Sequence, residues 1–179
     1  MHPIRTSVLA LSITVLACLK LFGQTPEVPW ADTMLAKRLI DESRQLNRAG
    51  DHHSALEKAR EAYSIYTHWY GGQHPSTAKA RMYVAREYRN LDQEQTALAL
   101  FGQSLPIFET AADTFRMAIC HLSIALCLRD LYRCTEAHQH LQTGIELLRP
   151  DSLQQATVIA DLYVGVGSVF NTEKNYRAA

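Results

Sequence analysis

Glycine and proline are scarce in this sequence, with 8 and 6 residues among 179, and they are scattered along the chain. Segments with the alternating pattern of a β-strand are also lacking, whereas Ala, Leu, Gln, Glu and Arg are plentiful, which favours helix almost everywhere. Because 47% of the residues are apolar, the composition excludes a largely disordered protein. The sequence therefore predicts an all-α domain with a substantial core.

A net charge is also missing, since 18 Lys and Arg residues balance 18 Asp and Glu residues. No overall field draws the molecule towards nucleic acid or an anionic membrane surface, so we expect no nucleic-acid partner. Any partner recognised through charge has to be recognised by a local patch.

The sequence has no apolar run long enough to span a membrane, because its longest, Ser7 to Cys18, has 12 residues where about 20 are needed. This run follows a short basic start and precedes the small residue Gly23, which is the pattern of a cleaved signal peptide. We therefore predict a signal peptide at 1–23, an extended linker at 24–31, and a secreted or periplasmic protein.

A competing interpretation takes the segment 15–18, Val-Leu-Ala-Cys, as a lipoprotein box. Cys18 would then carry a lipid anchor, and the protein would be attached at a membrane. The apolar residues Leu19, Leu21 and Phe22 argue against it, because they continue the run where a lipoprotein usually becomes polar.

Cleavage after Gly23 leaves only three cysteines, an odd number that implies no disulfide framework. Cys120 and Cys127 lie seven residues apart on one helical face with Ile124, which predicts buried thiols. A bridge between Cys127 and Cys134 is the alternative.

Signatures of catalysis are lacking too: there is no glycine-rich phosphate loop, no H-E-x-x-H and no G-x-S-x-G. We predict no catalytic residue, no cofactor and no metal, and hence no enzyme within this chain. Cys134 and His138 lie four apart and are the best metal-ligand pair, but zinc needs four ligands. His138 and His140 lie two apart and point to different helix faces.

What the sequence does contain is an internal repeat. Ala55, Ala97, Ala137 and Ala179 each follow a polar turn, at spacings of 42, 40 and 42 residues. Twelve residues before each alanine is a small residue that lets helices approach closely, namely Ser43, Ala85, Ala125 and Gly167. Nine residues before it is a bulky residue that fills the gap between helices, namely Leu46, Tyr88, Leu128 and Phe170.

Polar turns divide the chain into amphipathic segments that predict antiparallel helix pairs. The expected helices are 32–49 and 52–69, 76–91 and 94–109, 114–131 and 134–148, then 152–171 with a stub from about 174. Pro106 should kink its helix or end the regular hydrogen bonding early.

The order of small residue, bulky residue, turn and anchoring alanine resembles the tetratricopeptide repeat (TPR). The longer period, and the linker Gly72-Gln73-His74-Pro75, resemble the kinesin-light-chain subclass. The resemblance implies a right-handed superhelical solenoid of stacked antiparallel hairpins, with about three and a half repeats over 32–179. Glu42, at an otherwise apolar place, departs from the pattern.

Ala179 should open the second helix of a fourth repeat, so we expect a sequence truncated at its C-terminus, with Val166 and Phe170 exposed. The arrangement also resembles exported bacterial proteins in which such repeats precede a caspase-like (CHAT) protease. That resemblance implies an alternative function: a regulatory repeat region of a larger effector.

Register places the first helix of each pair on the concave side of the expected solenoid, where basic residues gather. We predict a scaffold that binds a protein or peptide there, with an acidic ligand favoured by the arginines. The predicted peptide-binding residues are Lys37, Arg44, Asn47, Arg48, Lys79, Tyr83, Arg86, Arg89, Asn90, Leu126 and Arg129.

Overall fold

The computed structural model describes residues 30–148 and 153–178, and every regular element in these two ranges is an α-helix. The helices are α2 (Trp30–Arg48), α3 (His52–Tyr70), α4 (Pro75–Asn90), α5 (Glu94–Thr110), α6 (Thr114–Asp130), α7 (Cys134–Leu147) and α8 (Leu153–Ala178). The predictions for the signal peptide, the lipid anchor at Cys18 and the anchor Ala179 fall outside the described residues and stay predictions.

The first six helices begin and end within two residues of the predicted positions, because local signals set their ends. The Asp51 carboxylate accepts a hydrogen bond from the backbone N–H of Ser54 at 3.1 Å, which caps α3. Pro75 occupies the first turn of α4, where a missing N–H costs nothing. Trp30 and Ala31, predicted as linker, are helical, and the nearby Asp32 favours the positive end of the α2 dipole.

Four of the turns that follow a helix share one geometry. Gly50, Asp92, Ala112 and Tyr132 have φ values of 82°, 55°, 51° and 59°. After each of them, a backbone N–H donates to a carbonyl five residues back, as Asp113 does to Phe108 at 2.9 Å. Only one of the four positions is glycine, so the other three turns hold an L-residue in the left-handed region.

Replacing Ala112 by glycine is expected to raise the free energy of unfolding by about 0.5–1 kcal/mol, because it removes the Cβ penalty of the left-handed conformation. Ala111 is a matched control one residue earlier, where the backbone is right-handed with φ −82°. Ala111→Gly should lower the free energy of unfolding by a similar amount. Urea titration of both variants and the wild type measures the two effects. Equal effects at the two positions would contradict the expectation.

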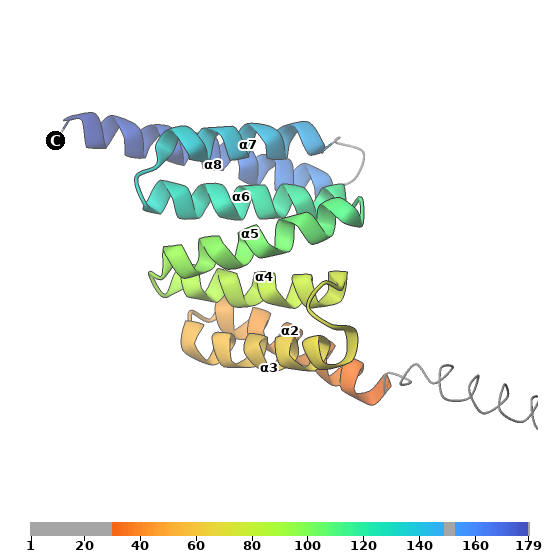
Figure 1. The fold of residues 1–179 in the computed structure, drawn as a ribbon. Coiled ribbons are helices and arrows are strands. Elements are labelled where there is room, and N and C mark those ends of the chain that lie inside the picture. Colours follow the sequence, from red (N-terminus) through yellow and green to blue (C-terminus); the bar gives the residue numbers. More distant parts are fainter. Residues whose placement is uncertain (1–29, 149–152, 179) are drawn as a thin grey trace, which may run out of the picture. The chain divides into compact units, whose positions relative to one another are not determined.

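Within the unit Ala31–Ala179 the helices pack in chain order, α3 on α4, α4 on α5, and so on to α8 (Figure 1). The first helices also meet one another, since α4 contacts α6 and α6 contacts α8. At the start of the series, Leu39 and Ile40 of α2 pack with Ala62 of α3 and Ala80 of α4. The fold is therefore an all-α solenoid of stacked helix hairpins, as predicted.

The predicted repeat positions are the points of close helix contact. Ala55, Ala97 and Ala137 are fully buried, as are the small residues Ser43, Ala85 and Ala125. Gly144 of α7 is packed even more closely, since an added Cβ would lie 2.8 Å from Leu162 of α8. The period in the sequence therefore marks the faces by which neighbouring helices approach.

The break expected in α8 was wrong, and α5 does not end early at Pro106. α8 continues without the predicted break near 172, because no glycine or proline lies at 171–174, and the Thr172 hydroxyl donates to the carbonyl of Ser168 at 3.0 Å. α5 continues four residues beyond Pro106 to Thr110, whose hydroxyl donates to the Pro106 carbonyl at 2.9 Å. Buried Arg81 of α4 also donates to the neighbouring Gln103 carbonyl at 3.1 Å, in the turn that the proline disturbs.

Of the two residues named as exposed in the fourth repeat, the structure exposes one. Phe170 is 62% exposed, whereas Val166 is partly buried against the core formed with Leu162 and Val169. Glu42, the charged residue at an apolar place, reaches Lys58 of α3 at 3.4 Å and so lies at the edge of the first hairpin. None of the described helices is both long and apolar enough to cross a bilayer.

Candidate functional site

Two adjoining pockets, of about 510 and 750 Å³, lie along the first helices of the hairpins, and together we call them the basic groove. They share the side chains of Arg44, Lys79, Tyr83 and Arg116, so each opens into the other. The groove takes side chains from α2, α4, α6 and α8, because the stack turns one face of each first helix to the same side.

Positive charge is concentrated in this groove although the whole chain is neutral. Two acidic side chains, Asp41 and Asp161, line it, against six basic ones: Lys37, Arg44, Arg48, Lys79, Arg86 and Arg116. This local excess of positive charge could attract an acidic partner, which the neutral chain as a whole would not.

Carboxylates neutralise only part of this charge. Asp41 lies 3.3 Å from Arg44, and Asp113 is paired with Arg116. The structure gives Lys37, Arg48 and Lys79 no ion-pair partner among the described residues. Partial burial lowers the pKa of Lys79, and the positive charges of Arg116 and Arg44 lower it further.

The larger pocket combines this charge with an apolar lining, formed by Met82, Phe101, Phe115 and Ile119. Tyr83 lies between the two kinds of surface, and the Arg86 guanidinium sits 5.0 Å from the centre of its ring. The groove can therefore contact acidic and apolar groups of the same ligand.

The structure brings together six of the eleven predicted binding residues in the groove: Lys37, Arg44, Arg48, Lys79, Tyr83 and Arg86. The other five do not line it: Asn47, Arg89, Asn90, Leu126 and Arg129. Arg129 instead donates to Asp130 at 2.6 Å and to Ser168 of α8 at 3.1 Å, so it joins α6 to α8.

Asn47 and Asn90 are engaged by a buried carboxylate. Glu87 of α4 is fully buried, and its Oε2 accepts hydrogen bonds from Asn47 at 2.7 Å and from Asn90 at 3.3 Å. Its Oε1 accepts two bonds from Arg86, at 2.8 and 2.7 Å, and His52 Nδ1 lies 3.4 Å from Oε2. Asn47 of α2 therefore joins the first hairpin to the second. Asn90 lies on α4 with Glu87 and reaches the first hairpin only through His52 of α3, whose Nδ1 is 3.4 Å from its side-chain nitrogen.

Sequence reasoning missed both Glu87 and Arg116. Glu87 had a signal, because it lies seven residues after Ala80 and three after Val84, on the stripe of α4 that is buried. Arg116 had none, since it belongs to the first turn of α6 and reaches the groove only through the packing of α6 against α4.

The cysteines and histidines form no metal centre with three or more His, Cys, Asp or Glu ligands in the part of the chain that the structure describes. His140 pairs with His121 of α6, with their Nδ1 atoms 2.9 Å apart, while His138 is 3.9 Å from Glu173. Cys127 and Cys134 are not bridged, so that alternative was wrong. Cys120 and Cys127 are buried as predicted, and burial raises the pKa of the Cys120 thiol to about 12.

Comparison with known proteins finds similar repeats. Residues 44–110 match the family model for the tetratricopeptide repeat. BtubC (BKLC) from P. vanneervenii aligns with a TM-score of 0.68 at 13% identity, covering 82% of this chain and 59% of that one. A kinesin-light-chain-type protein with nearly identical TPR-like repeats, from Podosopora anserina, gives 0.62 at 19% identity, covering 79% and 71%.

The likeness to these structures concerns the fold. A variant of the Podosopora anserina protein aligns equally well, with a TM-score of 0.61 at 19% identity over 79% of this chain and 70% of that one. No curated protein matches the sequence. The chain spans about three fifths of the BtubC chain, so its resemblance to that protein covers part of a longer molecule.

Proposed function

Because the chain is a helical repeat protein of the tetratricopeptide type, we propose that it is a binding scaffold whose basic groove holds an acidic peptide segment of a partner protein. Tetratricopeptide repeats are in general non-catalytic interaction modules, and the fold suggests a protein partner. The proposal of an acidic ligand rests on one observation: six basic side chains and only two acidic ones line a single groove of a chain with no net charge.

The groove favours an extended ligand, because it crosses successive first helices rather than ending in one closed cavity. Carboxylates of the ligand would pair with Lys37, Arg48 and Lys79, which have no ion-pair partner among the described residues. Apolar side chains of the same ligand would pack on Met82 and Ile119. This combination supports a binding role.

Fluorescence titration with a short glutamate-rich peptide tests the proposal. Reversing two charges with Arg44→Glu plus Lys79→Glu should weaken binding by about tenfold or more, since each reversal costs about 1 kcal/mol at an exposed site. Arg86 is left unchanged because it holds the buried Glu87. Binding by the wild type should also weaken as salt is added.

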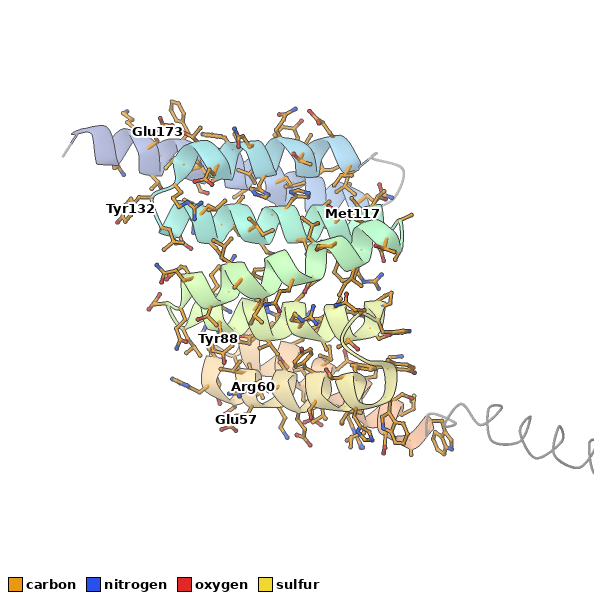
Figure 2. The ribbon with its side chains drawn as sticks, in the orientation of Figure 1. Glu57, Arg60, Tyr88, Met117, Tyr132 and Glu173 are labelled. Atoms are coloured by element: carbon orange, nitrogen blue, oxygen red, sulfur yellow. The ribbon has the colours of Figure 1, made fainter. Side chains whose placement is uncertain are left out.

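The matched control reverses two exposed charges that lie outside the groove, with Arg38→Glu on α2 and Arg60→Glu on α3. Figure 2 labels Arg60. This double variant changes the net charge equally, so a groove-specific interaction predicts a change in affinity of no more than about twofold. Equal weakening by both double variants would mean that only net charge matters, and unchanged binding in the groove variant would remove the groove.

A further inference from the structure

The smaller of the two pockets in the basic groove has a composition of its own. Four cationic side chains from three helices surround its volume of about 510 Å³: Lys37 and Arg44 from α2, Lys79 from α4 and Arg116 from α6. Tyr66 and Tyr83 line it as well. We call this part the cation pocket.

Two of its four positive charges are already offset. Asp41 lies 3.3 Å from Arg44, and Asp113 is paired with Arg116 through its other carboxylate oxygen while Oδ1 caps α6. Lys37 and Lys79 have no carboxylate within ion-pair distance in the described part of the chain. Two uncompensated positive charges therefore remain in one pocket.

The positive charges of the cation pocket repel one another. Partial burial lowers the pKa of Lys79, and Arg116, Arg44 and Lys37 all act in the same direction, against only Asp41. Burial also raises the pKa of Tyr66, so its hydroxyl stays protonated and keeps a proton to donate. An anion in the pocket would relieve the repulsion and find neutral as well as charged donors.

We propose that the cation pocket binds a phosphate monoester dianion, carried by the partner peptide of the basic groove as phosphoserine or phosphothreonine. The proposal rests on the proposed function and adds to it a phosphorylated residue as the anchor of the ligand.

Charge and donor geometry favour the dianion over a carboxylate. A phosphate monoester carries a charge of about −1.5 to −2 near neutral pH, which matches the two uncompensated lysines, whereas Asp or Glu offers one charge. It also presents three acceptor oxygens, enough for lysines and arginines that approach from α2, α4 and α6 at once. A carboxylate has two oxygens and would leave one lysine uncompensated.

The experiment titrates the full chain with three forms of one glutamate-flanked peptide whose central residue is serine, glutamate or phosphoserine. The phosphoserine form should bind about tenfold more tightly than the serine form and several-fold more tightly than the glutamate form. Phenyl phosphate and phenyl sulfate, similar in shape but different in charge near neutral pH, should compete unequally, with the phosphate several-fold stronger. Equal competition would overturn the charge argument.

The variant Lys37→Met plus Lys79→Met keeps both aliphatic stems and removes the two uncompensated charges. It should abolish the advantage of phosphoserine over serine, while Arg38→Met plus Arg60→Met, outside the pocket, should keep it. Circular dichroism and the melting temperature establish that both variants are folded. Retention of the advantage in the lysine variant would overturn the proposal.

The remaining outcomes separate this proposal from the function on which it rests. If the glutamate form binds in the groove and the phosphoserine form binds no more tightly, the phosphate site is wrong and the acidic-peptide scaffold stands. If no form of the peptide binds, both are wrong. If inorganic phosphate competes with phenyl phosphate but the phosphoserine peptide does not bind, the pocket takes a free anion and the partner-borne phosphate is overturned.

Discussion

Replacing Glu87 by alanine is expected to lower the free energy of unfolding by about 3–5 kcal/mol, because the change empties the buried carboxylate's place and leaves four hydrogen bonds from partly buried donors without their acceptor. Glu87 is fully buried and accepts hydrogen bonds from Arg86, Asn47 and Asn90. Domains of this size are stable by only about 5–15 kcal/mol, so the variant should unfold at a far lower urea concentration.

Two further variants serve as controls, one that keeps the shape of the Glu87 side chain without its charge and one that removes an exposed carboxylate elsewhere. Glu87→Gln keeps one acceptor oxygen but sets an amide N–H₂ among other donors, so we expect a smaller loss, about 1–3 kcal/mol. Glu57→Ala removes an exposed carboxylate from the outer side of α3 (Figure 2) and should change stability by less than about 0.5 kcal/mol. An alanine variant at Glu87 as stable as the wild type would mean that the network does not hold the first two hairpins together.

Truncating Phe108 to alanine should also cost about 3–5 kcal/mol, the usual range for a buried phenylalanine. Phe108 of α5 is fully buried and packs with Ala78 of α4 and Cys120 of α6. The cavity would therefore open where the second hairpin meets the third, under the guanidinium of Arg116, which lies 6.0 Å from the ring centre. Peptide affinity should fall together with stability, because Arg116 lines the groove.

Thermal or urea unfolding of Phe108→Ala, compared with Phe170→Ala, checks this expectation. Phe170 is 62% exposed on α8, so its truncation should change the free energy of unfolding by less than about 0.5 kcal/mol. Phe108→Leu refills most of the volume and should lose only about 1–2 kcal/mol. Similar losses for Phe108→Ala and Phe170→Ala would show that the hairpins do not share the buried face described above.

The arrangement of helices could be predicted from the sequence because a repeated pattern reports burial directly. A small residue at Ala85 and an anchor at Ala97 recur one period later at Ala125 and Ala137, and all four are fully buried. Polar turns fixed the ends of the first six helices for the same local reason. The continuity of α8 was missed because Asn171 and Thr172 are polar without breaking a helix.

The sequence predicted only part of the candidate site, because helix register indicates which side of a helix a residue faces but not which side chains it contacts on that side. Lys79 and Tyr83 were placed correctly by register alone. Asn47 and Asn90 face the same side, yet Glu87 from the neighbouring stripe of α4 engages both. Arg116 enters the groove through packing between hairpins, which a single sequence does not report.

Methyl NMR during titration with the glutamate-rich peptide tests most directly whether the partner segment lies in the basic groove. The methyl signals of Met82 and Ile119, which line the groove, should shift progressively with peptide. Those of Ile65 on α3 and Ile145 on α7, which do not line it, should stay in place. Shifts at Ile65 and Ile145 with none at Met82 and Ile119 would contradict a groove-bound partner.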